Sequence, residues 1–358
     1  MTQFFCGTRI FSGTGAVAKI GEMGARRLLV VADPVFAKNG TAERIAALAP
    51  EGRVYDRVEP DPSVALVAEG TAAVREFGPD LVVALGGGSA MDCAKAMVYF
   101  SGVAARLVAV PTTSGSGSEV TDFAILTHDG RKHPLIDEAL RPWAAVLDDE
   151  LLRELPKSLI ADAGFDVLCH AVEALGAKNA GAITDALARD AFCTAFAALP
   201  ESYGGNQVVR LGLHTAATMA GMAFSQAGLG LCHAMSHGLG GLYHLPHGRL
   251  NAILLPSVMD VNAVGAGEKY ARLARAAGLG GAAETVALRN LKNALVRLRR
   301  QLGMPQTLAE AGVEPRKVWA DMDRIVTGVL EDPCCGTNPV PVTARMVRQV
   351  LETVAGHG

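Results

Sequence analysis

The sequence lacks several features that would assign it to a particular class of protein. With a net charge of −3 and no run of basic residues, it offers no surface for nucleic acid. Its 7 cysteines form no CxxC pair, so we expect reduced thiols in a cytoplasmic protein. No uncharged apolar stretch has the length of a membrane helix, and the first residues show no signal-peptide pattern. We therefore expect a cytoplasmic enzyme without nucleic-acid or membrane partners.

The residues that are present favour two domains with large hydrophobic cores. The chain has 358 residues, of which 50% are hydrophobic and 19% are charged, and it contains 40 glycines. Up to residue 155, short apolar runs alternate with helical stretches, which is typical of an α/β fold. From residue 156 to residue 358, apolar residues recur at helical spacing almost throughout. The sequence thus predicts an α/β domain over residues 1–155, with a Rossmann-like parallel sheet, and an all-helical domain over residues 156–358.

Two apolar runs in the first domain end in residues suited to a dinucleotide. The run at residues 28–32 ends at Asp33, whose carboxylate would bind a ribose diol and repel a 2′-phosphate, although a plain helix cap is an equal alternative. The run at residues 81–85 leads into Gly86-Gly87-Gly88-Ser89 and then a helix, a layout that presents backbone N–H groups to a pyrophosphate. The pattern is not GxGxxG, and the acidic residue precedes it, so a standard Rossmann fingerprint is absent.

A third apolar run, residues 107–110, leads into a loop rich in hydroxyl groups. This loop contains Thr112, Thr113 and Ser116, which suit phosphate and nicotinamide amide groups. A flexible surface linker is the alternative, but ligands gather beyond the carboxyl ends of such strands. Lys132 lies further on and either meets a phosphate or ribose or is simply solvated.

The second domain contains every candidate metal ligand. Four of the nine histidines fall within residues 233–247, where His233 and His237 share a helical face and a glycine-rich loop is expected to follow. Upstream, Asp166 and His170 are also four residues apart. Such pairs also occur as plain helix contacts. Together with His233 and His247, however, they supply one anionic and three neutral ligands, a set that favours Fe(II) or Zn(II). A divalent ion in this set keeps a net charge of about +1 and can polarise an oxygen.

These motifs together resemble the iron-containing (group III) alcohol dehydrogenase family. The matching segments are Gly86–Ser89, Pro111–Thr113, Ser118–Thr121, Asp166–Glu173, His233–Gly248 and Asn251–Pro256. Within the family, residues 218–224 are most similar to the propanol and ethanol dehydrogenases of propanediol- and ethanolamine-utilisation systems.

The resemblance implies a role for each candidate residue. The two-domain architecture, shared with dehydroquinate synthase, would bind the metal through Asp166, His170, His233 and His247. His237 would lie beside the nicotinamide and the substrate as a proton-relay or positioning group, and Asp33 would favour NAD over NADP. The cofactor would be lined by Gly87, Gly88, Ser89, Thr112, Thr113 and Ser116, with Lys132 as a further candidate.

The expected function is that of a metal-dependent, NAD(H)-linked alcohol dehydrogenase. It would interconvert short-chain primary alcohols and aldehydes, favouring aldehyde reduction, with Fe(II) as the metal or Zn(II) as the alternative. We expect a homodimer or larger homo-oligomer, and the resemblance leaves a microcompartment location open. Three alternatives remain: a maleylacetate reductase-like enzyme, a dehydroquinate synthase-type lyase, and a non-catalytic metal or scaffold protein. Short loops near residues 48–60 and 262–285 leave the substrate pocket and the oligomer contacts open.

Overall fold

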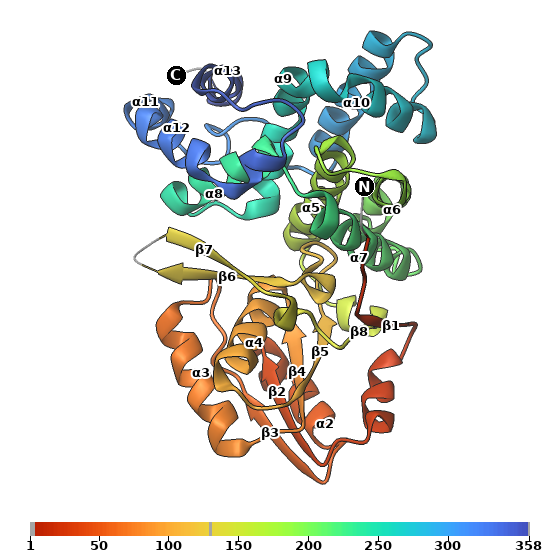
Figure 1. Ribbon diagram of the computed structural model, residues 1–358. Helices are drawn as coiled ribbons and strands as arrows, with labels where there is room; N and C mark the ends of the chain where they lie inside the picture. The colour runs from red at the N-terminus through yellow and green to blue at the C-terminus, as the bar shows by residue number, and fades with distance from the viewer. Residues whose placement is uncertain (1–3, 129–130, 357–358) are drawn as a thin grey trace. The chain divides into compact units, whose positions relative to one another are not determined.

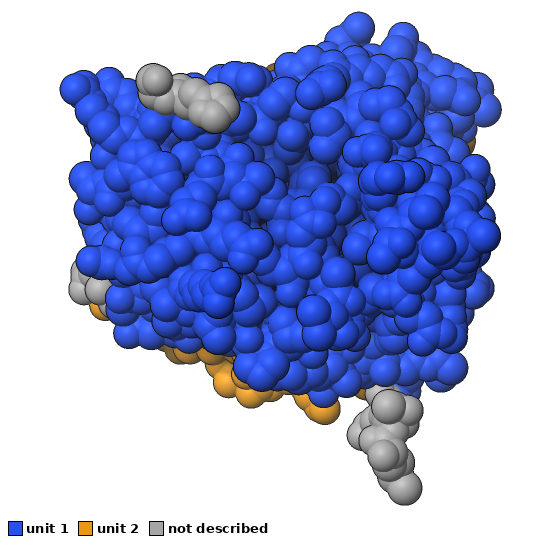
Figure 2. Space-filling view, turned by 90° about the horizontal axis from the view of Figure 1, so that it is seen from above, with its two compact units in different colours: residues 1–4, 156–358 blue, residues 5–155 orange. Residues whose placement is uncertain are grey.

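The computed structural model describes residues 4–128 and 131–356. These residues form two compact units, which Figure 2 shows in different colours. Residues 5–155 form the first, called here the α/β unit. The residues from Pro156 onward, together with Phe4, form the second, called here the helical unit.

A six-stranded parallel sheet is the framework of the α/β unit (Figure 1). Its strands are β1 (Arg9–Ser12), β2 (Arg27–Ala32), β3 (Glu51–Tyr55), β4 (Leu81–Gly86), β5 (Arg106–Pro111) and β8 (Ala144–Leu147). They lie in the order β1-β8-β5-β4-β2-β3, and every neighbouring pair is parallel. The predicted parallel sheet is confirmed, and the three apolar runs in the sequence are β2, β4 and β5.

The sheet is buried on both faces, which explains why its central strands are continuously apolar. Alternate residues of β2 point to opposite sides: Leu29 belongs to one hydrophobic cluster and Val30 to the other. Helices α3 (Val64–Phe77) and α4 (Gly88–Ser101) contribute to the first cluster, and α2 (Thr41–Ala46) contributes to the second.

The chain changes direction across the sheet at β2. Helices α1 (Pro34–Lys38) and α2 connect β2 to β3 on one side, and α3 then leads back past β2 to β4 on its other side. In doubly wound sheets, ligands bind beyond the carboxyl ends of the strands that flank such a reversal. Asp33 follows β2 and Gly86 ends β4, so the reversal places both at this position.

A buried polar network fastens the loop after β5 to α4. The ammonium group of Lys95 donates to the hydroxyls of Ser118 and Thr121, and to the backbone oxygens of Thr121 and Phe123, at 2.9–3.0 Å. Ser118 in turn donates to the buried carboxylate of Asp92 at 2.7 Å. Burial lowers the pKa of Lys95 to about 8 and raises the pKa of Asp92. The network therefore fixes the hydroxyl-rich loop from the inside.

The rest of the α/β unit consists of short elements that the sequence pattern does not predict. Strands β6 (Phe123–His128) and β7 (Arg131–Ile136) form a separate antiparallel pair. The short 3₁₀ helices are η1 (Ala16–Met23), η2 (Ser118–Val120), η3 (Glu138–Leu140) and η4 (Asp149–Leu152).

The helical unit contains no strand among its described residues, as the predicted all-helical half requires. Its α-helices are α5 (Lys157–Gly176), α6 (Ala182–Tyr203), α7 (Arg210–Ala227), α8 (Leu231–Tyr243), α9 (His247–Ala276), α10 (Glu284–Gln301), α11 (Pro315–Ala320), α12 (Met322–Glu331) and α13 (Ala344–Val354), with the 3₁₀ helix η5 (Pro333–Thr337).

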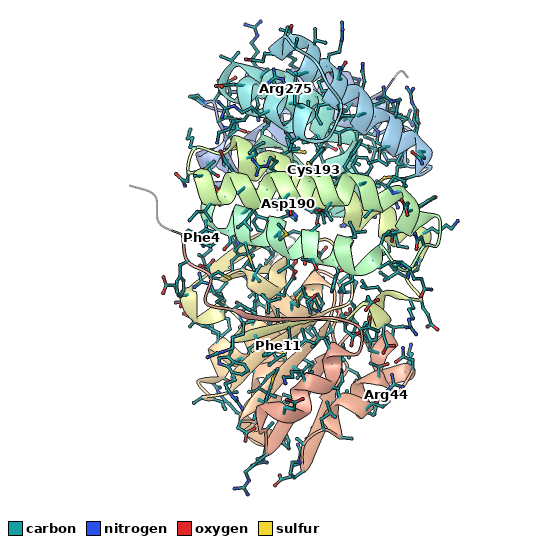
Figure 3. All side chains as sticks on the ribbon, turned by 90° about the vertical axis from the view of Figure 1, so that its right-hand side faces the viewer. Phe4, Phe11, Arg44, Asp190, Cys193 and Arg275 are labelled. Carbon is teal, nitrogen blue, oxygen red and sulfur yellow. The ribbon has the colours of Figure 1, made fainter. Side chains whose placement is uncertain are left out.

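Helix α5 lies at the centre of the helical unit and packs against α6, α7 and α9. The neighbouring α6 shows why the sequence folds this way. Its residues Ala188, Phe192 and Leu199 recur at helical spacing and are fully buried, whereas Asp190 on the opposite side is exposed (Figure 3). Because α5 is covered by several such apolar stripes, almost all of its own side chains are buried.

The predicted glycine-rich loop after His237 is wrong. Gly238, Gly240 and Gly241 belong to α8, which continues to Tyr243. Each glycine inside a helix costs about 1 kcal/mol relative to alanine, so the cost is met by tertiary packing. Helix α8 packs against α9, α12 and η5, and a β-carbon at Gly238 or Gly240 would already contact a neighbouring side chain.

Helix α9 is long and apolar enough to cross a membrane by length and composition alone. However, 61% of its most apolar window is buried inside the protein. It packs against α5, α8, α10 and α13, which is the environment of a core helix.

Replacing Lys95 by methionine should destabilise the protein strongly. The change removes the only cation of the buried network described above and leaves the charge of Asp92 uncompensated, a loss of about 3–5 kcal/mol. The measurement is urea-induced unfolding at neutral pH. The matched control is Lys19→Met, because Lys19 forms an exposed ion pair with Glu22 and should contribute less than about 1 kcal/mol. Equal unfolding midpoints for the two variants would contradict the role of the network.

Candidate functional site

One face of α5 carries three polar side chains in an otherwise apolar environment. Asp166, His170 and Glu173 are separated by four and three residues, so they lie on the same helical face, and all three are buried. The first turn of α9 lies directly against this helix. A β-carbon at Gly248 would lie 2.0 Å from the backbone oxygen of Asp162, so only glycine permits this approach. The approach brings His247, the first residue of α9, to the carboxylate of Asp166.

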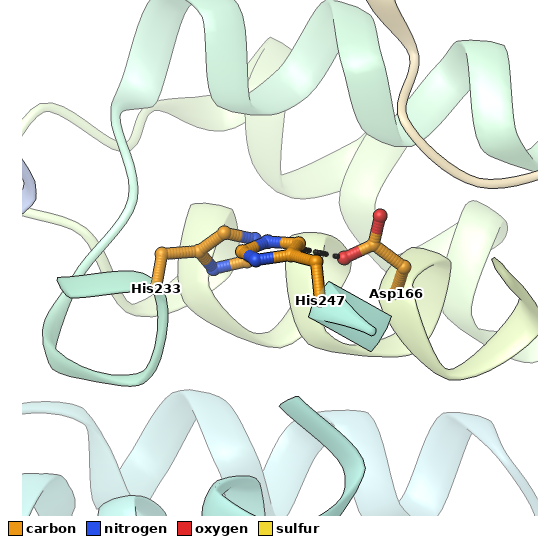
Figure 4. A group of neighbouring side chains, drawn as sticks. All are labelled: Asp166, His233 and His247. Carbon is orange, nitrogen blue, oxygen red and sulfur yellow. Dashed lines mark ion pairs between the residues drawn. The ribbon is translucent and has the colours of Figure 1, made fainter. Parts of the chain in front are cut away.

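Three imidazoles surround the carboxylate of Asp166. Its Oδ1 atom lies 3.6 Å from Nε2 of His247 and 3.8 Å from Nε2 of both His233 and His170. Figure 4 shows that the side chains of Asp166, His233 and His247 point toward one another. Possible ligand atoms of these three lie within 4.8 Å of one another, whereas His170 is outside this mutual set. The structure thus brings all four predicted ligands together, with three of them in the closest group.

These distances fit the surroundings of a small cation. They are too long for hydrogen bonds, but neighbouring ligand atoms in a tetrahedral site with bonds of about 2.0–2.2 Å are separated by about 3.3–3.6 Å. The pKa values of His233 and His247 lie well below the usual value because of burial, so both rings are neutral and offer lone pairs. The ring of His170 is stacked between Phe224 and His233, and its Nδ1 is buried without a hydrogen bond within the described chain. The donors present therefore fit Fe(II) or Zn(II).

Glu173 orients His233, a role that the sequence analysis does not assign. Its Oε2 atom lies 2.6 Å from Nδ1 of His233. The same carboxylate accepts backbone N–H groups of Gly230, Cys232 and His233, at the start of α8. Burial raises the pKa of Glu173 to about 7, although these backbone hydrogen bonds oppose the shift. A proton held on Nδ1 leaves the lone pair on Nε2 facing Asp166.

Asn251 orients the carboxylate of Asp166, as Glu173 orients His233. Its side-chain amide donates to Oδ1 of Asp166 at 2.7 Å, and its own oxygen accepts the hydroxyl of Ser236. Asn251 is fully buried on α9. Glu173 and Asn251 both lie in segments that resemble the family. The helical spacing of Glu173 from Asp166 is the sequence signal that indicates its position beside the ligands.

A second group of possible ligands, Cys169, Glu173 and His233, is a poorer candidate for a cation. Both oxygens of Glu173 already accept backbone N–H groups, and Nδ1 of His233 is bonded to the same carboxylate. This group therefore serves to hold the imidazole of His233 in its orientation.

His237 lies next to the predicted ligands but has a partner of its own. Its ring stacks on His247, with centroids 5.3 Å apart, and its Nδ1 lies 2.8 Å from Oδ2 of Asp332. Burial opposes ionisation of Asp332, but the hydrogen bonds from His237 and from the backbone of Cys334 prevail, and the pKa of Asp332 is lowered. No local sequence pattern indicates Asp332, which lies 95 residues from His237. His244 follows the last residue of α8 in a left-handed conformation, and its side chain is exposed.

The predicted dinucleotide residues also gather in one place, at the carboxyl ends of β2, β4 and β5. Asp33 accepts the backbone N–H of Gly87 at 2.9 Å, and burial raises its pKa despite this hydrogen bond. Its side chain does not cap the following helix α1. Gly86 has a φ of +155°, and a β-carbon there would lie 2.3 Å from the Asp33 carboxylate, so the position requires glycine.

The hydroxyl-rich loop lies beside the same glycines, and Lys132 is connected to Ser89 through Asp61. A β-carbon at Gly87 would lie in van der Waals range of Thr113, and one at Gly88 would lie 3.1 Å from Ser116. The backbone N–H of Thr112 donates to the backbone oxygen of Gly86 at 2.9 Å. On the other side, Lys132 pairs with Asp61 at 2.8 Å, and the backbone of Asp61 donates to the hydroxyl of Ser89 at 3.3 Å. All eight predicted cofactor residues, Asp33, Gly87, Gly88, Ser89, Thr112, Thr113, Ser116 and Lys132, thus belong to one connected cluster.

Comparison with known proteins gives a consistent result over the whole chain. Residues 160–355 match the family model of the Fe-containing alcohol dehydrogenase family, C-terminal, and residues 7–149 match that of iron-containing alcohol dehydrogenase. The 1-propanol dehydrogenase PduQ of Salmonella typhimurium is 40% identical over 98% of this chain and 99% of its own. Among solved structures, an iron-containing alcohol dehydrogenase from Thermococcus thioreducens is 32% identical, with a TM-score of 0.92 over 98% of this chain and 99% of its own. A sulfoacetaldehyde reductase from Bifidobacterium kashiwanohense, solved in complex with NAD+, is 25% identical, with a TM-score of 0.89 over 100% of both chains.

Replacing Glu173 by glutamine should weaken metal binding. The amide cannot stabilise a proton on Nδ1 of His233 as the carboxylate does, and loss of such a supporting group lowers metal affinity by about 10–100-fold. The measurement is competition for Fe(II) or Zn(II) against a chelator of known affinity.

Glu352→Gln, on the exposed side of α13, is the matched control and should leave the affinity unchanged. Glu173→Asp keeps the charge but shortens the side chain, so its affinity should be intermediate. Wild-type affinity in a folded Glu173→Gln protein would refute the orienting role.

Proposed function

Because the chain belongs to the iron-containing alcohol dehydrogenase family, we propose that it interconverts short primary alcohols and aldehydes with NAD(H), chiefly by reducing the aldehyde. The observation that carries this proposal is the convergence of the Asp166 carboxylate with the imidazoles of His233 and His247. A relative named for 1-propanol supports the substrate class, and a relative solved with NAD+ supports the cofactor.

The proposed ligands of the cation are Asp166, His170, His233 and His247. Fe(II) is the proposed metal, with Zn(II) as the alternative, because oxygen and imidazole ligands suit both ions. Held by these residues, the cation would supply Lewis-acid polarisation of the substrate oxygen, and the nicotinamide would supply the hydride chemistry. The protein's own contribution is to keep the imidazoles of His233 and His247 neutral and to hold them against Asp166.

The reaction also requires a proton on the substrate oxygen, and we assign its transfer to His237. Asp332 holds a proton on Nδ1 of this ring, which leaves Nε2 as the atom that gives up or accepts a proton. Because the pKa of Asp332 is lowered, the carboxylate stays ionised and stabilises the ring when both its nitrogens are protonated.

In the α/β unit, the connected cluster is the proposed NAD(H) site. Asp33 would bind a ribose diol, and the backbone N–H groups at the start of α4 would face the pyrophosphate. The remaining proposed contacts are Gly87, Gly88, Ser89, Thr112, Thr113, Ser116 and Lys132.

The lyase alternative requires a cationic pocket for a phosphorylated acid. Arg249 is the arginine nearest the histidine segment in the sequence, and both oxygens of Asp162 already accept its guanidinium at 2.9 and 3.2 Å. The intact ligand group likewise favours the alcohol dehydrogenase over a maleylacetate reductase. A homo-oligomeric state, a cytoplasmic location and a microcompartment association stay predictions.

The function is tested by a panel of short aldehydes and alcohols with NADH, NADPH and their oxidised forms. Protein reconstituted with Fe(II) should reduce short aldehydes with NADH, and His247→Ala at saturating metal should lose at least about 100-fold in kcat/KM because one ligand is gone. His244→Ala, which alters an exposed histidine nearby, is the matched control and should keep full activity. Undiminished turnover of His247→Ala would remove this residue from the ligand set, and no turnover of any panel member by the wild type would refute the proposed function.

Asp33→Asn should relax the preference for NADH over NADPH. The amide oxygen can still accept the Gly87 N–H, but the charge that repels a 2′-phosphate is lost. We expect the ratio of kcat/KM for NADPH to that for NADH to rise about tenfold, equivalent to about 1.4 kcal/mol. Glu43→Gln, exposed on α2, is the control. An unchanged ratio would show that Asp33 serves only to hold the glycine loop.

A further inference from the structure

A third group of side chains that could hold a metal ion lies beside the proposed iron ligands. Ligand atoms of His237, Asp332 and Cys334 all lie within 4.8 Å of one another, and all three residues are partly exposed. None of them belongs to the four proposed iron ligands. They come from two elements, α8 and η5, that pack against each other.

Local hydrogen bonds prepare this group. The Oδ1 atom of Asp332 accepts the backbone N–H of Cys334 at 2.8 Å, which caps η5 and leaves Oδ2 for His237. The adjacent Cys335 is directed elsewhere, because its thiol donates to the backbone oxygen of Val329 at 3.0 Å. Of the two adjacent thiols, that of Cys334 is therefore the one that lies near His237 and Asp332.

The chemistry of this group differs from that of the iron ligands. It contains a thiol in addition to imidazole and carboxylate, whereas the Asp166 group contains no sulfur. Thiolate favours Zn²⁺ over harder cations, and three protein ligands with one open position form a common zinc arrangement. A tetrahedral ion would require the 2.8 Å separation between His237 Nδ1 and Asp332 Oδ2 to widen only to about 3.3 Å.

We propose that His237, Asp332 and Cys334 form a second cation site, selective for Zn²⁺, whose occupation inhibits the enzyme. Binding at Nδ1 of His237 moves the single proton of the neutral ring to Nε2, and the Cys334 thiol loses its proton to water, so the ring can no longer take up a proton from the substrate. The inhibition, although not the binding, rests on the proposed function, because it requires His237 to be the proton-transfer group. Loss of a general acid–base group costs about 100-fold or more in turnover.

The site is tested by titrating the full-length protein with Co²⁺ and Zn²⁺. Wild-type protein should bind two equivalents, and the cobalt form should show a sulfur-to-cobalt charge-transfer absorption, which the Asp166 group cannot produce. Cys334→Ser should bind one equivalent and lack the band. Cys335→Ser is the matched control and should retain both. His247→Ala should weaken the first site while the thiolate band persists, so failure of the iron site and failure of this site are distinguishable.

The functional consequence is measured on protein already loaded with Fe(II). Added Zn²⁺ should lower kcat by about 100-fold in the wild type and in Cys335→Ser, with little effect on Cys334→Ser. A single binding equivalent in the wild type, or a thiolate band that survives in Cys334→Ser or disappears in Cys335→Ser, would overturn the proposal. A band without inhibition would retain the site and refute its control of His237.

Discussion

The buried carboxylate of Glu173 is the interaction on which the helical unit's chemistry depends. It joins the middle of α5 to the start of α8 by accepting three backbone N–H groups and by bonding Nδ1 of His233. The N-terminus of a helix leaves such donors unpaired, and an anion there is favoured by the helix dipole. The side chain of Glu173 therefore accepts the unpaired N–H groups at the start of α8 and also sets the tautomer of His233. Packing and ligand geometry are coupled, because α8 cannot shift along α5 without releasing His233.

The α/β unit uses a carboxylate in a comparable way. Asp33 leaves β2 and bonds the glycine turn that follows β4, so the ends of two neighbouring strands are tied together where the chain reverses across the sheet. Its position requires a bare glycine at Gly86, since any side chain there would collide with the carboxylate. On the far side, Lys95 holds the loop after β5 from within the core. The loops that would touch a dinucleotide are thus held by hydrogen bonds within the α/β unit, and such preorganisation lowers the entropic cost of binding.

The sequence was sufficient for features that depend on local periodicity. The strands β2, β4 and β5 are short apolar runs because both faces of the sheet are covered, and the pair Asp166–His170 is visible because helical spacing places both on one face. Features that depend on contacts across the chain were not visible. Asp332 lies 95 residues from His237, and Glu173 lies 60 residues from His233. At Gly238, Gly240 and Gly241 the local sequence predicts the wrong structure, because intrinsic propensity favours a loop whereas packing against α9, α12 and η5 imposes a helix.

Two histidines one helical turn apart on α8 acquire different tasks because their carboxylate partners differ in environment. Glu173 is fully buried, and burial keeps His233 neutral, so this imidazole is suited to donate a lone pair and remain in place. Asp332 is partly exposed, and its lowered pKa keeps it ionised, so the same contact at His237 would suit the proton transfer proposed for this ring. The difference follows from depth in the helical unit, since the two side-chain contacts have the same chemical form. An imidazole that exchanges protons must be reachable, and a reachable imidazole beside a thiol is also open to a competing cation. On this reasoning the proposed inhibitory site follows from the accessibility that proton transfer requires.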